Sequence, residues 1–242
     1  MRYLIFSDVH SNLEAVETFD RLRKDLDYDR LVCLGDIVGY GANPNEVVDW
    51  VRENAQIVLA GNHDYAAVEK TCTEYFNPYA LRSCVWTREM LTKENKDYLA
   101  SLPVDLVKDA IHWSHSSPLE PEEWHYVISR YDGIDNFPHF EEACCFIGHT
   151  HRPCILEEDP FERVQLFADT EFELKPDSRY LINVGSLGQP RDGSPDPCFA
   201  LFDSETGTYQ LQRFRYDFEQ AQKKILDNGL PAFLAERLAV GL

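Results

Sequence analysis

Apolar positions in the first 60 residues follow two alternating patterns. Short apolar runs predict buried strands at residues 3–7, 30–34 and 56–60. Between the first two runs, apolar residues recur at helical spacing from Asn12 to Leu26. After the second run, Asn43 and Pro44 predict the start of a helix that continues to Val51. This part of the chain is therefore typical of β-α-β units.

The rest of the chain is richer in strands. Helical patterns at 78–91 and 93–101 come first, and residues 218–238 predict closing helices. Residues 208–214 alternate polar and apolar positions after a Gly207 turn, which predicts a hairpin with the strand before them. The predicted strands of this half lie at 104–107, 110–114, 143–147, 153–157, 164–168, 179–184 and 198–203. β-α-β units followed by a strand-rich half predict a layered α/β fold of two packed sheets.

One segment departs from both patterns. Residues 116–138 show little periodicity and contain proline and several aromatic residues, which is typical of a lid or an insertion. No linker or internal repeat divides the chain, and a protein of 242 residues can bury a full core without disulfide bonds or structural metals to stabilise it. We therefore expect a single domain over residues 1–242, with a lid or insertion at 116–138.

Charge and cysteine content narrow the class of protein. The 42 acidic residues outnumber the 23 Lys and Arg and give a formal charge of −19, which disfavours nucleic acid and anionic membranes as partners. The acids Glu120, Glu122 and Glu123 add to this at the start of the insertion. The seven cysteines are odd in number and form no C-x-x-C pair, which is typical of reduced thiols in the cytoplasm. No apolar run approaches about 18 residues and no leader precedes the first strand, so we expect a cytoplasmic protein.

Several predicted strands end in polar residues that suit metal binding. The clusters are Asp8 and His10, Gly35-Asp36, Gly61-Asn62-His63-Asp64, His115, and Gly148-His149-Thr150-His151. Ligands of open α/β sheets bind beyond the carboxyl ends of the strands, so these clusters predict one assembled site. In an extended segment the side chains of Asp8 and His10 point to the same side and could hold one cation. His149 and His151 lie in a loop that could direct them to two different ions.

The donor types indicate which ions to expect. Imidazole, carboxylate and amide oxygen suit borderline metals, and we expect two divalent or mixed-valence ions from the group Mn, Fe, Zn, Ni and Co. Two such ions bring roughly four positive charges, against two negative charges from Asp8 and Asp36. The resulting positive cavity could attract a small phosphorylated substrate into an acidic protein. Arg191 could add a bidentate phosphate contact, and Arg152 is a weaker candidate.

The ordered blocks D-x-H, G-D-x-x-G, G-N-H-D, a single His and G-H-x-H resemble the calcineurin-like metallophosphoesterase superfamily. The resemblance covers residues 8–151, and residues 183–193 resemble a block of its small prokaryotic phosphodiesterase-like branch. It implies a four-layer α/β/β/α sandwich of two mixed sheets with a two-metal centre at the sheet edges. It also implies hydrolysis of phosphate mono- or diesters, of small molecules or nucleotides, by in-line attack of a metal-bridging hydroxide.

The resemblance also implies a role for each site residue. One metal would be held by Asp8, His10, Asp36 and His151, and the second by Asp36, Asn62, His115 and His149, with Asp36 bridging. The catalytic residue His63 would lie beside the scissile phosphate as a proton donor, oriented by Asp64. Asn62, His63 and Arg191 would contact the phosphate.

Alternatives remain at the level of residues and of function. His112 is a rival of His115, because Ser116 replaces the glycine that usually follows the family histidine. Serine/threonine protein phosphatases of the superfamily carry Asp-Arg in the second block, where this chain has Gly39 and Tyr40, and symmetrical dinucleoside polyphosphate hydrolases resemble that arginine-bearing pattern. A non-catalytic scaffold of this fold is less favoured, because every ligand position is filled and His63 is present.

Overall fold

The computed structural model describes residues 1–242 and contains two six-stranded sheets. The strand order of the first sheet is β3-β2-β1-β11-β12-β9, and that of the second is β4-β5-β6-β10-β7-β8. The first comprises β1 (Arg2–Phe6), β2 (Arg30–Cys33), β3 (Ile57–Val58), β9 (Glu171–Glu173), β11 (Cys198–Asp203) and β12 (Thr208–Arg213). The second comprises β4 (Asp105–Lys108), β5 (Ile111–Ser114), β6 (Cys144–Ile147), β7 (Cys154–Glu158), β8 (Val164–Phe167) and β10 (Arg179–Asn183).

Both sheets are mixed. In the first sheet β1, β2 and β3 run parallel, and β11, β12 and β9 continue it with antiparallel pairs. In the second sheet β5, β6 and β10 run parallel, and β4, β7 and β8 pair antiparallel at the two sides. Each sheet therefore contains three neighbouring parallel strands whose carboxyl ends lie at the same edge. Ligands of α/β proteins bind at such an edge.

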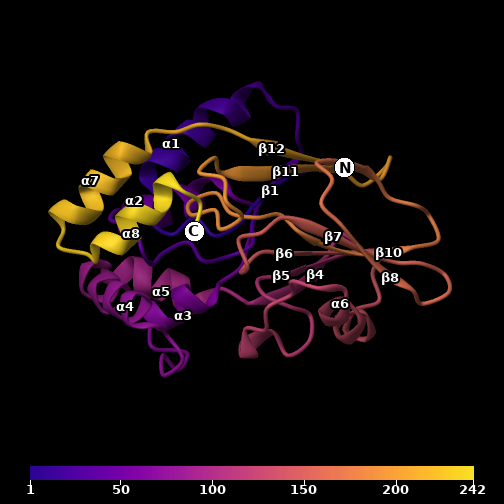
Figure 1. Cartoon of the computed structure of the whole chain (residues 1–242), viewed down its shortest axis with the longest axis horizontal. Coiled ribbons are helices and arrows are strands. Elements are labelled where there is room, and N and C mark those ends of the chain that lie inside the picture. The colour runs from indigo at the N-terminus through magenta and orange to yellow at the C-terminus, as the bar shows by residue number, and fades with distance from the viewer.

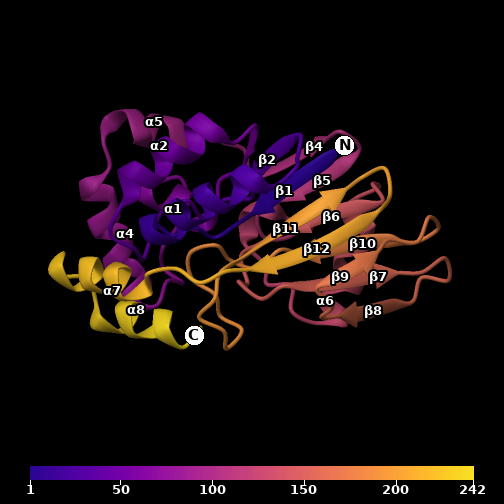
Figure 2. The same cartoon turned by 90° about the horizontal axis from the view of Figure 1, so that it is seen from above.

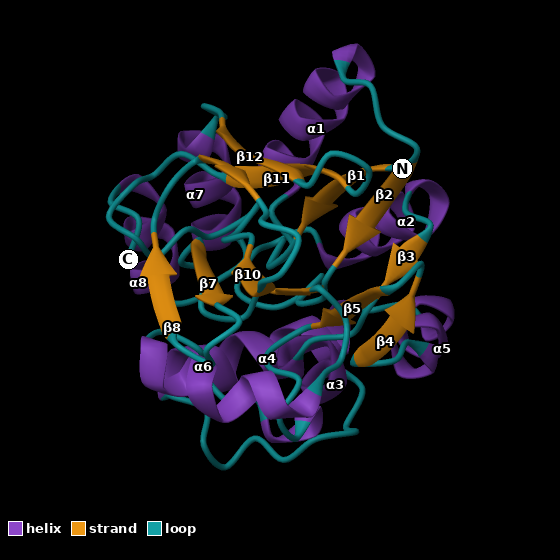
Figure 3. Ribbon diagram, turned by 90° about the vertical axis from the view of Figure 1, so that its right-hand side faces the viewer, coloured by secondary structure: helices purple, strands orange, loops and turns teal.

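The two sheets pack face to face and carry helices on their outer faces (Figure 3). Alternation along β1 shows why: Tyr3 and Ile5 join the core between the sheets, while Leu4 and Phe6 join the core under the helices. Helices α1 (Leu13–Leu22), α2 (Pro44–Asn54) and α5 (Lys93–Ser101) contribute to that outer core of the first sheet, and α6 (Arg130–Asn136) covers the second sheet. This α/β/β/α arrangement confirms the expected fold class.

The remaining helices gather at one end of the molecule, on the left of Figures 1 and 2. They are α3 (Asn62–Ala67), α4 (Pro78–Met90), α7 (Phe218–Asp227) and α8 (Ala232–Glu236). Apolar residues of α4, α7 and α8 form a small core with Tyr40. Short 3-10 turns occur at Arg23–Asp25, Pro121–Glu123, Phe137–His139 and Arg237–Ala239. No helix has both the length and the apolar character that a membrane crossing requires.

Three elements were not expected from the sequence pattern. Helix α3 begins inside the polar G-N-H-D block, and strand β9 has only three residues, so neither shows an apolar repeat. Helix α6 lies inside the segment 116–138, where Ser129 and Asp132 form a reciprocal capping box. The second half of that segment therefore belongs to the helical layer over the second sheet. Whether the chain is one domain with a lid stays a prediction.

Candidate metal centre

The loops that follow five strands place acidic and imidazole groups together. Asp8 and His10 follow β1, Asp36 follows β2, and Asn62 follows β3, all in the first sheet. His115 follows β5, and His149 and His151 follow β6, all in the second sheet. Asn12 caps α1 through a hydrogen bond from the Ala15 amide, so Asp8 has no capping role. The carboxyl ends of both sheets therefore supply one site.

The first group of ligand atoms comes from Asp8, His10, Asp36 and His151, whose atoms all lie within 4.8 Å of one another. His151 Nε2 is 3.1 Å from both Asp8 Oδ1 and His10 Nε2. The two imidazole nitrogens and the two carboxylates lie close enough together to coordinate one ion. This geometry and donor set fit a divalent cation.

The second group comes from Asp36, His115 and His149, again within 4.8 Å of one another. Asp36 Oδ2 lies 3.5 Å from His10 Nε2 and 3.5 Å from His115 Nε2, so one carboxylate oxygen faces both groups. The other oxygen, Oδ1, accepts a hydrogen bond from the backbone amide of His63 at 2.8 Å. This bond fixes the carboxylate between the two groups.

Orphaned polar atoms give an independent test of whether metal ions fit. The buried atoms Asp8 Oδ1, Asn62 Oδ1, His115 Nε2 and His149 Nδ1 have no hydrogen-bond partner. An unsatisfied buried polar group is costly and rare in a folded protein, and a coordinated ion is one accepted explanation. Asn62 Oδ1 adds an amide oxygen to the second group. The residues present therefore fit bound metal ions.

Backbone carbonyls fix the orientation of four site histidines. Each ring faces one carbonyl oxygen through the nitrogen that points away from the cluster; the pairs are His10 with Val38, His115 with Leu34, His149 with Trp124, and His151 with Gln189. A proton held between one nitrogen and a carbonyl leaves the other nitrogen as a neutral ligand. Metal-binding histidines in proteins have this arrangement.

The backbone at the ligands is strained. Asp8, His10, Asp36, His149 and His151 all have φ between 50° and 64°, a region that residues other than glycine rarely adopt. Asp8 and His10 therefore reach the same cluster through left-handed conformations, and the extended segment expected from their spacing is absent. Such strain persists only where the surrounding structure enforces it, and it concentrates at functional sites.

Close backbone approach at Gly61 brings the second and third loops together. A side-chain carbon on Gly61 would lie 2.1 Å from Asp36 Oδ1, so only glycine fits there. Asp64 accepts hydrogen bonds from the amides of Gly61, Ile37 and Val38, at 2.9–3.2 Å. This differs from the expectation that Asp64 orients His63: both carboxylate oxygens are occupied by backbone amides. Asp64 holds the loops that carry the ligands.

His63 lies beside the metal ligands in an aromatic setting. Its ring centroid is 5.0 Å from that of His10, 4.4 Å from Tyr40 and 4.9 Å from Phe76. Nδ1 is buried without a partner and faces Gly39, where an added side-chain carbon would lie 2.6 Å away. The Nε2 edge is therefore the one that could meet a ligand.

Arg191 and Arg152 are both near the site but differ in what they contact. The Arg191 amide donates to the His151 carbonyl, its guanidinium donates to Gln189 Oε1, and its Nε is buried without a partner. Arg152 donates through Nε to the Arg191 carbonyl at 2.8 Å. Arg191 thus keeps donor capacity for a ligand, while Arg152 supports its backbone.

Burial and mutual charge set the protonation states of the site. Burial opposes ionisation of Asp36, yet His115 and His63 hold the pKa of this carboxyl well below its usual range. Burial also lowers the pKa of His149 to about 3 and that of His10 well below its ordinary value. Burial alone would lower the pKa of His115, but the charge of Asp36 raises it to about 9. Ionised Asp36 and neutral His10 and His149 are the forms that bind cations, whereas His115 would release a proton on binding.

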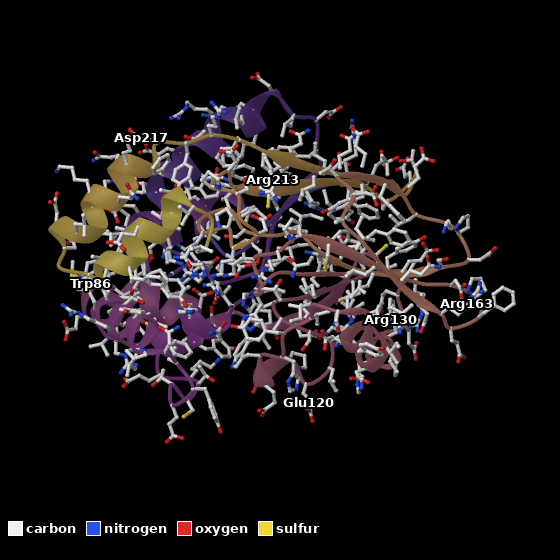
Figure 4. The ribbon with its side chains drawn as sticks, viewed as in Figure 1. Trp86, Glu120, Arg130, Arg163, Arg213 and Asp217 are labelled. Atoms are coloured by element: carbon white, nitrogen blue, oxygen red, sulfur yellow. The ribbon has the colours of Figure 1, made fainter.

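Two further observations concern residues near the site. His112 is a buried residue of β5 whose Nε2 is hydrogen-bonded to Asp105 Oδ1 at 2.5 Å, so it belongs to a pair apart from the site. Trp124, whose carbonyl holds His149, escaped the sequence analysis because a backbone contact from an aperiodic segment leaves no sequence signal. Glu120, near the start of the same segment, lies at the outer edge of the molecule (Figure 4).

Comparisons of the sequence and of the structure with known proteins agree on one family. The model of the calcineurin-like phosphoesterase superfamily domain matches residues 1–207. The chain is 38% identical over 241 residues to an uncharacterized protein of Methanocaldococcus jannaschii, covering 98% of this chain and 97% of that protein. A metallophosphoesterase from Sphaerobacter thermophilus is 37% identical with a TM-score of 0.89, covering 100% of this chain and 99% of that one. A hypothetical protein from Pyrococcus horikoshii shares the fold at 18% identity, with a TM-score of 0.80 and coverage of 100% and 98%.

Proposed function

This chain belongs to the calcineurin-like phosphoesterase superfamily, and we propose that it hydrolyses phosphate mono- or diesters of small molecules or nucleotides with two bound metal ions. The observation that carries the proposal is the pair of ligand groups that share Asp36, together with their orphaned atoms. The relative from Sphaerobacter thermophilus supports it, because its name states that it is a metallophosphoesterase.

We assign the ligands as two sets. Asp8, His10, Asp36 and His151 would hold one ion, and Asp36, Asn62, His115 and His149 the other. The donor set suits Mn, Fe, Zn, Ni or Co. Bound ions would supply Lewis-acid polarisation of a phosphoryl oxygen and lower the pKa of water at the site.

The chain's own residues would perform the remaining steps. The Arg191 guanidinium would bind and orient the phosphoryl group, because it retains donors and lies beside His151. His63 would donate a proton from Nε2 to the leaving oxygen, since its other ring nitrogen faces Gly39. Tyr40 and Phe76 would exclude water from the side of the His63 ring that they cover.

The test compares hydrolysis of p-nitrophenyl phosphate and bis-p-nitrophenyl phosphate by metal-stripped protein to which Mn, Ni, Fe, Zn or Mg is returned. We expect metal-dependent turnover, reduced at least about 100-fold by His63→Ala with no loss of bound metal. The ratio of the two rates distinguishes monoesterase from diesterase activity. Absence of both metal binding and turnover would overturn the proposal and favour a non-catalytic scaffold.

A further inference from the structure

Two arginines from distant parts of the chain meet at the ring of Tyr40. The guanidinium carbons of Arg191 and Arg237 lie 5.4 Å and 5.8 Å from the Tyr40 ring centroid. Neither forms an ion pair with an Asp or Glu side chain: Arg191 donates to Gln189 Oε1, and Arg237 donates through Nε to the Leu242 backbone oxygen. Both therefore keep guanidinium N–H donors without a partner beside the site, at Nε of Arg191 and at the two terminal nitrogens of Arg237.

The closeness of the two charges carries a free-energy penalty. Burial first, and the positive charge of Arg191 second, lower the pKa of Arg237 to about 10. Like charges held together away from bulk water destabilise a structure unless a counter-charge is present. An anionic ligand between the two guanidinium groups would supply that counter-charge.

The position of Arg237 is fixed by the helices around it. It begins the 3-10 turn after α8, and Leu234 and Leu238 on either side of it are buried in the core that contains Tyr40. Lys224 fastens α7 to the rest of the molecule through Glu14 at 2.5 Å and Asn43 at 3.1 Å. Figure 1 shows α7 and α8 together at the helical end. Arg237 is thus presented by a packed element and not by a free tail.

The two arginines lie at different depths. The backbone amide of Arg191 donates to the carbonyl of the ligand residue His151, so Arg191 lies close to the ligand groups. Arg237 reaches the ring of Tyr40 from the turn after α8, and its hydrogen bond goes to Leu242 and not to a ligand loop. A phosphoryl group at the metal centre would therefore contact Arg191 first, and Arg237 would face the part of the substrate next to it.

We propose that Arg237, together with Arg191, forms a subsite for a second anionic group of the substrate, a phosphate or a carboxylate adjacent to the scissile phosphate. The inference rests on the proposed function and narrows its substrate class to phosphoesters that carry another acidic group. Residue 237 lies beyond the part of the chain that the superfamily model matches, residues 1–207, so the C-terminal helices supply one of the two arginines of the subsite.

The test measures binding without turnover. Calorimetry on the full chain loaded with Mn²⁺ compares methylphosphonate, which has one anionic group, with methylenediphosphonate and phosphonoacetate, which add a phosphonate or a carboxylate. Charged hydrogen bonds of about 1.5–3 kcal/mol correspond to about 10–100-fold in affinity. We expect the wild type to prefer at least one two-anion ligand by this factor, and Arg237→Gln to remove the preference.

Matched variants separate charge from folding. Arg237→Lys keeps the charge and is expected to retain most of the preference, and circular dichroism checks the fold of each variant. Arg215→Gln makes the same charge change at an exposed arginine outside the site and is expected to leave the preference intact. Chelation of Mn²⁺ by the two-anion ligands is common to all variants, so the difference between variants isolates Arg237. The ligand that loses more affinity identifies phosphate or carboxylate as the second group.

Two results would overturn the subsite. One is a wild type with no preference for either two-anion ligand, and the other is an Arg237→Gln variant that behaves like Arg215→Gln. The proposed function fails separately, through absence of both metal binding and hydrolysis of simple phosphoesters. A chain that hydrolyses p-nitrophenyl phosphate but shows no two-anion preference would keep the first proposal and lose the second.

Discussion

Asp64 is fully buried, and its two carboxylate oxygens accept hydrogen bonds from three backbone amides. Burial and the negative charge of Asp36 oppose ionisation of Asp64 and raise the pKa of Asp64 to about 7. The hydrogen bonds from the three amides act in the opposite direction and favour the carboxylate form. The three amides belong to the loops after β2 and β3, which carry Asp36 and Asn62. At the scale of single residues, the site therefore depends on an acidic side chain that binds no ligand itself.

Removal of this carboxylate should destabilise the protein. Asp64→Ala leaves three amides without their acceptor, and we expect the free energy of unfolding to fall by about 3–5 kcal/mol. Urea denaturation in the presence of a chelator measures this without a contribution from bound metal. The control Asp97→Ala removes an exposed partner of Lys93 and should change stability by less than about 0.5 kcal/mol. Equal losses in the two variants would contradict the role given to Asp64.

At the scale of elements, one ligand is held by a segment outside the strand-end loops. The carbonyls that orient His10, His115 and His151 belong to the loops that follow β2 and β10. The carbonyl that orients His149 belongs to Trp124. Trp124 is itself left-handed, with φ of 59°, and its indole donates to Thr71 Oγ1 at 3.2 Å. Its ring also lies 6.0 Å from that of His115. The second ligand group therefore depends on the insertion.

This dependence predicts a selective effect of Trp124→Gly. Glycine adopts the left-handed backbone readily, so the change removes the side-chain anchor without forcing a new conformation. Because loss of support behind a ligand typically costs 10–100-fold in metal affinity, we expect one of two Mn²⁺ sites to weaken about tenfold or more. Two-site calorimetric titration gives both constants. Tyr131→Ala, at an exposed residue of α6, should alter neither, and equal weakening of both sites would rule out the selective role.

The elements differ in how well the sequence alone predicts them. The sequence predicts the ligand clusters because each follows a short apolar run directly, and it predicts one assembled site because ligands bind beyond the carboxyl ends of strands. It does not predict that these strands belong to two different sheets. Helix α6 and strand β9 were missed because they are short and lack a long apolar repeat. Trp124 and Arg237 could not be assigned to the site, because each reaches it through long-range packing that no local pattern encodes.

At the scale of the whole molecule, both ligand groups join the two sheets. The first takes Asp8, His10 and Asp36 from the first sheet and His151 from the second. The second takes Asp36 from the first sheet, and His115 and His149 from the second. Since the sheets otherwise meet through a continuous apolar core, the fold does not require metal. Bound ions would act as two cross-links added at one edge of that core.

Metal removal should therefore lower the melting temperature without unfolding the chain at room temperature. An ion at 100 times its dissociation constant adds about 2.7 kcal/mol of stability, so two ions predict a fall of about 10 °C or more on chelation. Scanning calorimetry with and without chelator, and with Mn²⁺ returned, measures the shift. Asp36→Ala removes the carboxylate that both groups share and should melt at one temperature in all three conditions. If a wild type shown by elemental analysis to hold two ions melts equally with and without chelator, the ions do not cross-link the sheets.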